Sequence, residues 1–244
     1  MLKERENVGV LSSNALKLIA IISMTIDHFG MLFYPQATWL RAIGRISYPI
    51  FAFMLAQGSM FTRHKLKYFM QIFLLGILCQ TVSVLALNDY HQNVLITLSL
   101  ALLFCYISLW LKNSVKTQNT RQIILASCVA IIYLSLMYYL CYYLGKTINN
   151  PQFAIDYGLI GIVLPSTLLF ADNKWLNFAS FSLGLILLSL SSVAVQWFCL
   201  LALPLLLCYS GKRGQAQLKY LFYIYYPLHL AVLYALLYLK LFIW

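Results

Sequence analysis

Residues Ile19–Gln57 read IAIISMTIDHFGMLFYPQATWLRAIGRISYPIFAFMLAQ, and this stretch decides the fold. A short break at residues 34–36 separates two hydrophobic segments, each long enough to cross a bilayer. A charged side chain near the middle of a membrane helix costs about 2.5 to 3.5 kcal/mol, so such residues usually face a protein interior or a wet cavity and have a function. Four ionisable residues lie in or beside this apolar sequence: Asp27, His28, Arg41 and Arg45.

These four residues predict a reaction centre. Asp27 and His28 supply a carboxylate and an imidazole, whereas Arg41 and Arg45 are four residues apart and place two guanidinium groups on one helix face. We interpret the set as a proton-transfer pair facing an anion clamp, with His28 oriented by Asp27. Structural roles are the alternatives: Asp27 pairs with an arginine to hold two helices together, His28 is a hydrogen-bonded core histidine, Arg41 ends a loop, and Arg45 only packs.

Composition indicates an integral membrane protein. Hydrophobic residues make up 62% of the 244 positions and charged residues 9%, and the mean hydropathy is +0.81. A soluble domain of this composition would have too little polar surface to cover itself. The net charge of +11 is explained by cytoplasmic loops, and no basic stretch is interleaved with aromatic residues, so nucleic acid is not an expected partner. The six cysteines show no CxxC spacing, and no metal site is expected.

Hydrophobic periodicity predicts an all-α, polytopic transmembrane helix bundle that forms one domain over residues 1–244. We expect about nine spans, within a range of eight to ten, judged against the roughly 20 residues that cross a bilayer. Pro165 and Pro204 lie in short segments, so the sixth to eighth spans are expected to be tilted, broken or partly re-entrant. Pro49 removes the donor for the Arg45 carbonyl, which predicts a bend there or another donor. The nine segments lie near residues 15–34, 42–61, 66–87, 94–111, 122–144, 157–171, 175–190, 197–210 and 220–243.

Lysine and arginine concentrate in every second connection. The intervening connections hold Asp89, His91, Lys146 and Asp156 but almost no other cation, so the positive-inside rule predicts a cytoplasmic N-terminus. An odd number of spans then places the C-terminus outside. The cations of the basic connections are Lys3, Arg5, Lys17, Arg63, Lys65, Lys67, Lys112, Lys116, Arg121, Lys174, Lys212, Arg213 and Lys219.

In this topology further polar residues are expected near the same pocket on the outer side or at mid-membrane. Asn93 opens the fourth span, and Asp156-Tyr157 opens the sixth. In the last span the spacing of Tyr225, Tyr226 and His229 places all three on one helix face. The alternatives are hydrogen bonds between helices for Asn93 and an aromatic packing stripe for the last set.

Several motifs resemble the TraX family, whose namesake is associated with N-terminal acetylation of conjugative pilin. They begin with LKLIAIISMTIDHFGMLFYP and LRAIGRISYPIFAFMLAQG and continue with TRHKLKYF, NVLITL, DYGLIGIVLP, SGKRG and LFYIYYPLHL, in that order over nearly the whole chain. The resemblance implies a polytopic acyltransferase related to the membrane acyltransferases that use acyl-coenzyme A.

The expected function is therefore transfer of an acyl group, most simply acetyl from cytoplasmic acetyl-CoA, to an amine or hydroxyl at the outer side of the cell membrane. That membrane is the cytoplasmic membrane if the source is bacterial, and the acceptor is an envelope pilin, glycan or lipid. His28 takes the acceptor's proton or carries the acyl group, while Arg45 and Arg41 stabilise negative charge or bind the donor. Arg63, Lys65 and Lys67 are candidates for the phosphates of coenzyme A, with a purely topological role as the alternative. A transporter or lipid flippase using the same cluster, and an inert assembly scaffold, are the rival functions.

Overall fold

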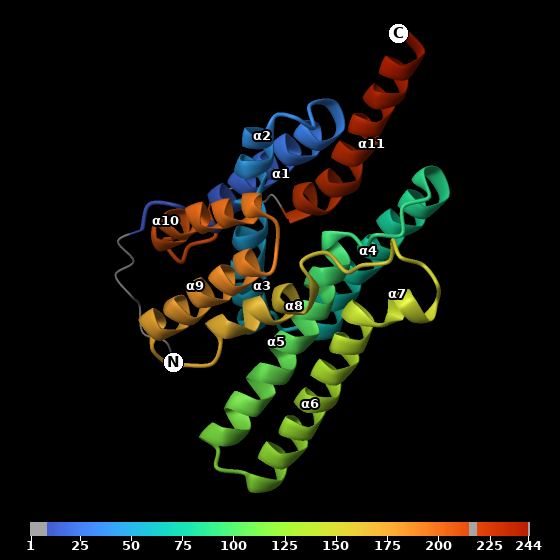
Figure 1. Ribbon diagram of the computed structural model, residues 1–244. Coiled ribbons are helices and arrows are strands. Elements are labelled where there is room, and N and C mark those ends of the chain that lie inside the picture. Colours follow the sequence, from blue (N-terminus) through green and yellow to red (C-terminus); the bar gives the residue numbers. More distant parts are fainter. Residues whose placement is uncertain (1–8, 215–218, 244) are drawn as a thin grey trace. The chain divides into compact units, whose positions relative to one another are not determined.

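A computed structural model describes residues 9–214 and 219–243, with the side chains of residues 86, 87, 219–222 and 240–243 left undescribed. Figure 1 shows a chain built from helices, and no β-strand occurs in the described ranges, which confirms the predicted all-α class. The chain forms two compact units. Unit 1 comprises residues 1–54 and 189–244, and unit 2 comprises residues 55–188. The single domain expected over residues 1–244 stays a prediction.

Two helices, α3 and α9, begin in one unit and end in the other. Unit 1 contains α1 (Ser13–Phe33), α2 (Thr38–Gly44), the start of α3 (Ser47–Phe61), η2 (Ala194–Leu201), α10 (Ala202–Leu207) and α11 (Lys219–Ile243). Unit 2 contains the rest of α3, α4 (Lys65–Leu87), α5 (Val94–Lys116), α6 (Thr120–Tyr142), α7 (Leu144–Thr147), α8 (Gly158–Val163), η1 (Leu164–Leu168) and most of α9 (Lys174–Leu190).

Local signals fix the start of α1. Ser12 is its N-cap, and the Ser12 hydroxyl accepts a hydrogen bond from Ala15 N at 3.2 Å. The segment before the helix pairs with the segment that follows α10, because Leu11 N donates to Cys208 O at 2.9 Å and Ser210 N donates to Leu11 O at 2.8 Å. Ser13 N also donates to a carbonyl of that later segment. The first turn of a helix leaves its backbone N–H groups without partners inside the helix. At the start of α1, carbonyl groups nearly 200 residues later in the sequence accept these hydrogen bonds.

The second predicted span, residues 42–61, is not one helix. A turn at Arg45 and Ile46 separates α2 from α3, so Arg45 ends α2 as its C-cap instead of lying inside a longer helix. Pro49 explains the break, because it has no N–H for the Arg45 carbonyl and is well tolerated in the first turn of a new helix. The expected bend is therefore a complete interruption, and it lies beside the candidate site.

Within the described residues, four helices are long and apolar enough to cross a membrane. They are α1, residues 65–85 of α4, α5 and α6. Residues 158–168, 174–190, 194–207 and 223–239 form shorter apolar helices. These lengths confirm helices suited to a membrane, whereas nine crossings and the predicted orientation stay predictions.

The sixth and eighth predicted spans each combine an α-helical part with a 3-10 part, and their tilt or re-entry stays a prediction. An α-helical turn at α8 continues into the 3-10 helix η1, which has Pro165 at its start. The eighth segment consists of η2 followed by α10, with Pro204 inside α10. The seventh segment differs, because α9 runs without interruption over 17 residues.

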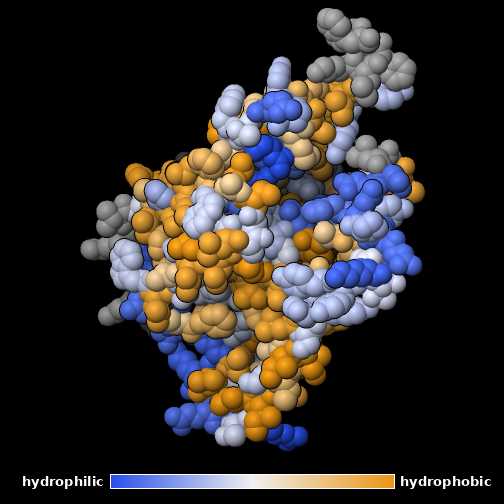
Figure 2. All heavy atoms as spheres, in the orientation of Figure 1, coloured by the Kyte–Doolittle hydropathy of each residue, from blue (hydrophilic) through white to orange (hydrophobic). Residues whose placement is uncertain are grey.

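Unit 2 is organised by the antiparallel pair α5 and α6 (Figure 1). The Tyr133 hydroxyl of α6 donates to Leu100 O of α5 at 2.7 Å, and Met137, Ile155 and Ile162 form a buried cluster nearby. The opposite face of α6 is apolar and exposed, with Ile131 at 64% of its maximum exposure. Figure 2 shows hydrophobic side chains over much of the visible exterior of the helices, which is typical of surfaces in contact with lipid.

Candidate active site

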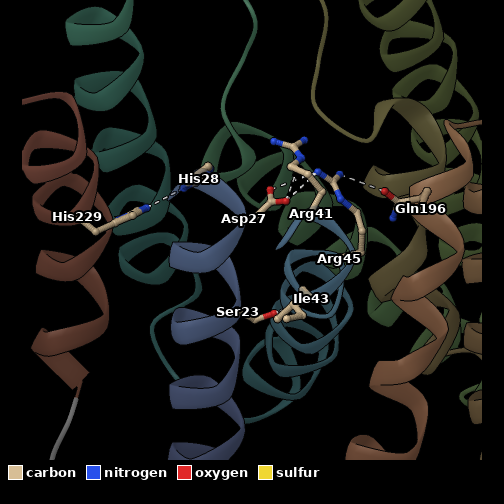
Figure 3. A network of polar contacts seen from close by, with 8 residues as sticks. All are labelled: Ser23, Asp27, His28, Arg41, Ile43, Arg45, Gln196 and His229. Atoms are coloured by element: carbon tan, nitrogen blue, oxygen red, sulfur yellow. Dashed lines mark hydrogen bonds and ion pairs between the residues drawn. The ribbon is translucent and has the colours of Figure 1, made fainter. Parts of the chain in front are cut away.

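Asp27 is the centre of a polar cluster in unit 1. Arg45 Nη2 lies 3.2 Å from both carboxylate oxygens of Asp27, and Arg41 Nε lies 3.3 Å from Oδ1 (Figure 3). The side chains of Asp27 and Arg45 are mostly buried, whereas that of Arg41 is 28% exposed. The predicted pair of arginines on one face is present, and one carboxylate from α1 holds both.

Close packing of α1 against α2 makes this arrangement possible. Gly44 lies directly against Asp27, so that a Cβ built at Gly44 would be 2.1 Å from Asp27 Cβ. One turn further toward the start of α1, the Ser23 hydroxyl donates to Ile43 O. At the other end of the hairpin, Gly30 packs on Leu40 in the same way. Glycine at these positions lets the two backbones approach, as is common between helices in membranes.

Gln196 joins the cluster from η2. Arg45 Nη1 donates to Gln196 Oε1 at 3.3 Å, and the Gln196 residue is 2% exposed (Figure 3). Sequence reasoning missed this residue. The signal was a single glutamine inside the apolar segment SVAVQWFCL, residues 192–200, where a polar side chain needs a partner.

The cluster carries an excess of one positive charge. Asp27 is the sole acidic residue between residues 9 and 54 and between residues 189 and 244, whereas Arg41 and Arg45 both carry a charge at any ordinary pH. Electrostatic interactions are stronger where water is largely excluded. A partly buried site with this imbalance favours an anion or a group that develops negative charge.

His28 points away from the arginines and toward α11. Its Nδ1 lies 2.9 Å from Nε2 of His229, and the two ring planes are inclined by 19° with centroids 5.1 Å apart (Figure 3). His229 Nδ1 lies 3.0 Å from Tyr225 O. A carbonyl oxygen only accepts hydrogen bonds, so His229 carries its proton on Nδ1 when it is neutral.

That assignment fixes the tautomer of His28. Nε2 of a His229 protonated at Nδ1 is an acceptor, so Nδ1 of His28 must donate to it. The lone pair of neutral His28 therefore lies on Nε2. A histidine oriented in this way is suited to act as a general base or a nucleophile.

Tyr225 supports the histidine pair in two further ways. Its ring stacks on His229 with centroids 5.3 Å apart, and its hydroxyl lies 2.7 Å from Thr25 Oγ1. Thr25 Oγ1 also lies 2.9 Å from Ile21 O. A hydroxyl has one proton, so Thr25 donates to that carbonyl and accepts from Tyr225. Tyr226 completes the set with an edge-on contact to His229.

The expected orientation of His28 by Asp27 is wrong. Consecutive residues of an α-helix point about 100° apart, so adjacent side chains do not face each other. The contacts of Asp27 go to Arg41 and Arg45, and the contact of His28 goes to His229. Asp27 thus has the ion-pairing role that the sequence left as an alternative, and His229 is the residue that orients His28.

Asn93, Asp156 and Tyr157 belong to unit 2, and their proposed place near the pocket stays a prediction. Asn93 caps α5 by accepting from Leu95 N at 3.0 Å, and its amide donates to Gly76 O at 2.9 Å. The Asp156 carbonyl accepts from the Thr97 hydroxyl at 2.8 Å. Tyr157 has φ of 59°, a left-handed conformation that is uncommon outside glycine, at the start of α8.

The proposed phosphate ligands Arg63, Lys65 and Lys67 also lie in unit 2 and are exposed. Arg63 is in the connection between α3 and α4, and both lysines are in the first turn of α4. Lys65 Nζ lies 5.4 Å from the centroid of the Tyr106 ring, and the Tyr106 hydroxyl donates to Lys65 O at 3.1 Å. All three side chains are accessible to a soluble anion.

Most of the chain is similar to known proteins. The family model described as TraX protein matches residues 12–237. The "Probable fimbrial assembly protein FimC, serogroup H1" of Dichelobacter nodosus is 27% identical over 91% of this chain and 94% of its own length. The "Uncharacterized protein RP591" of Rickettsia prowazekii (strain Madrid E) is 32% identical over 42% of this chain and 38% of its own. No solved structure matches.

Proposed function

The chain belongs to the TraX family, which is linked to pilin and fimbrial assembly, and on that premise we propose that it is a membrane-embedded acyltransferase. The proposed reaction transfers acetyl from cytoplasmic acetyl-CoA to an amine or hydroxyl of an envelope component. A pilus or fimbrial subunit is the acceptor that the relatives favour, and a glycan or lipid would offer the same nucleophiles. The observation that carries the proposal is that His28, whose tautomer is fixed by His229, is next to Asp27 on α1, and Asp27 binds the two arginines of a net-positive cluster.

The histidine pair supports proton transfer. Nε2 of His28 removes the proton from the acceptor's amine or hydroxyl, whose nitrogen or oxygen attacks the thioester carbonyl. The resulting imidazolium keeps its Nδ1–H directed at His229 Nε2, so the pair shares the charge that His28 gains. When the C–S bond breaks, the leaving thiolate takes the proton from His28 Nε2. One acyl bond forms, one breaks, and His28 returns to its starting state.

The arginine cluster supports the charge that develops on the acyl oxygen. Arg45 is held by both oxygens of Asp27 and by Gln196, so its guanidinium is fixed before any substrate binds. Hydrogen-bond donors that are held in place before the reaction stabilise the charge of the transition state, and in a site with little water they usually contribute strongly to the rate. Asp27 keeps the two arginines together while leaving one positive charge uncompensated.

The proposed setting is the bacterial cytoplasmic membrane, crossed about nine times with the N-terminus inside. In this topology acetyl-CoA comes from the cytoplasm, where Arg63, Lys65 and Lys67 would bind its phosphates. The acceptor reaches the site from the outer side. His28 and Asp27 lie in the second half of α1, the outer half in this orientation.

The test is label transfer by purified protein in lipid nanodiscs. Wild-type protein is incubated with radiolabelled acetyl-CoA, with and without envelope extract, and both labelled product and free coenzyme A thiol are measured. We expect transfer that is lost in His28→Ala and retained in His91→Ala, because His91 is an exposed loop residue of unit 2. Transfer or hydrolysis equal in wild type and His28→Ala would contradict the proposal. A transporter or scaffold would produce neither labelled product nor free thiol.

A further inference from the structure

Gln196 lies in the 3-10 helix η2 and is held rigidly. Gln196 N donates to Val193 O at 2.8 Å, and Gln196 O accepts from the Ser189 hydroxyl at 3.3 Å. The residue is 2% exposed. Both backbone groups are therefore fixed, and the side chain has little freedom to leave the arginine cluster.

Its contact with Arg45 determines which way the amide faces. A guanidinium donates hydrogen bonds and accepts none, so the atom 3.3 Å from Arg45 Nη1 must be the amide oxygen. The amide nitrogen consequently faces away from that contact. The Arg45 guanidinium thus determines the orientation of the Gln196 amide.

The amide nitrogen lacks a conventional acceptor. Gln196 Nε2 is buried and has no oxygen or nitrogen acceptor among the described residues. The neighbouring Cys199 thiol interacts with Gln196 and lies 3.4 Å from Ser189 Oγ, but sulfur is a weak acceptor. A buried donor left in this condition destabilises a protein by about 1 to 3 kcal/mol. A ligand that supplies an acceptor for Gln196 Nε2 would remove this destabilisation.

We propose that Gln196 Nε2 donates a hydrogen bond to the acyl oxygen of the substrate, so that Gln196 and Arg45 form the donor pair for the negative charge developing on it. This inference rests on the proposed acyl transfer and adds a substrate-contacting residue to it. Arg45 and Gln196 are joined through Nη1 and Oε1, so the two donors belong to neighbouring side chains. The same contact would position a thioester carbonyl before attack.

Two substitutions separate donation to substrate from support of Arg45. Gln196→Glu keeps an oxygen acceptor for Arg45 and removes the N–H group. Gln196→Met has a similar length, adds no charge, and also removes the N–H group. Loss of one donor to a developing oxyanion lowers kcat by about 100- to 1,000-fold, and we expect at least a 100-fold loss in both variants. KM for acetyl-CoA should change less than about threefold, because the contact strengthens in the transition state.

Cys199→Ala is the matched control, because it removes the neighbouring thiol and leaves the amide. It should keep kcat within about threefold of wild type. Thermal unfolding of each variant in the same detergent shows whether the cluster is intact. If one of the two Gln196 variants fails to insert into the membrane, the kinetic comparison uses the other variant.

The outcomes are distinct. A folded Gln196→Glu or Gln196→Met protein with wild-type kcat would overturn the inference, and so would a loss of activity in Gln196→Met alone, which would mean that Gln196 only supports Arg45. If the proposed function itself is wrong, the result is different: the wild-type protein releases no thiol and labels no product.

Discussion

Nδ1 of His28 lies 2.9 Å from Nε2 of His229, which joins the first and last helices of unit 1 through the nitrogen that is not expected to react. The proton on His229 is fixed by Tyr225 O, and the proton on His28 is fixed by His229. His229 therefore has the place that a carboxylate occupies in a Ser-His-Asp triad. A neutral imidazole keeps the pair free of a permanent charge inside an apolar helix bundle.

Replacement of His229 tests this assignment. His229→Ala should lower kcat by roughly 100-fold or more, because His28 loses the acceptor that sets its tautomer and supports its protonated form. The double variant with His28→Ala should be no less active than His28→Ala alone, since residues that act as a unit are not additive. Acetyl transfer by the four proteins of this cycle is the measurement. Additive losses would mean that the two histidines act separately.

Asp27→Asn is expected to act first on stability. The substitution leaves Arg41 and Arg45 without their shared carboxylate, and breaking a buried ion pair costs about 3 to 5 kcal/mol. Partial exposure reduces this cost, so we expect a loss of about 1 to 3 kcal/mol in the free energy of unfolding. Thermal unfolding in detergent is the measurement.

Asp172→Asn is the control for that experiment. Asp172 Oδ1 lies 2.9 Å from Lys112 Nζ, and the lysine lowers the pKa of this carboxyl, but the side chain is 80% exposed. An exposed ion pair contributes little, so the melting temperature should hardly change. Equal losses in the two variants would contradict a special role for the Asp27 cluster.

The sequence predicted the parts of this site that depend on short-range spacing. An offset of four residues, from Arg41 to Arg45 and again from Tyr225 to His229, places side chains on one helix face, and the structure has both arrangements. A high content of apolar residues likewise predicted helices suited to a membrane. These inferences need only helix geometry and the cost of burying charge.

Long-range pairing could not be predicted in the same way. Asp27 and His28 are neighbours in sequence, yet their partners come from α2 and α11, and Gln196 reaches the cluster from a 3-10 helix that no periodicity indicated. The break before α3 was also underestimated, because Pro49 is compatible with a kink as well as with a new helix start. Which of these occurs depends on the packing of α2 against α1.

Gly44→Ala tests that packing. Alanine is a better helix former than glycine by about 1 kcal/mol, so the substitution would stabilise a helix that had free space at this position. Here the added Cβ would lie 2.1 Å from Asp27 Cβ, an atom fixed by the α1 backbone. Overpacking of this kind costs about 1 to 3 kcal/mol, and the melting temperature should fall. Gly184→Ala should be milder, since its Cβ would meet Leu164 Cδ1, the tip of a flexible side chain.

The two chain ends should lie on opposite sides of the membrane. Basic connections imply a cytoplasmic N-terminus, and an odd number of spans places the C-terminus outside. Accessibility of single cysteines to an impermeant reagent would measure this in cells. Reporters at residues 117–119 and 88–93, the connections on either side of α5, provide internal and external references. Both ends on the cytoplasmic side would contradict nine spans and remove the proposed outer access to His28.

Arg45→Lys should impair catalysis far more than folding. Arg45 bonds both oxygens of Asp27 through Nη2 and Gln196 Oε1 through Nη1, a fork that an ammonium group cannot reproduce. The lysine keeps the charge and one contact with the carboxylate, so the melting temperature should change little while kcat falls by roughly 100-fold.

Arg41→Lys is the comparison, because Arg41 makes a single contact with Asp27 and is more exposed than Arg45. Its kcat should stay within about tenfold of wild type. Since both variants preserve the net charge of the cluster, a difference between them measures geometry and not electrostatic attraction alone. Wild-type kcat in a folded Arg45→Lys protein would show that a point charge is sufficient at this position. Arg45 would then hold Asp27 in place without contacting the acyl group.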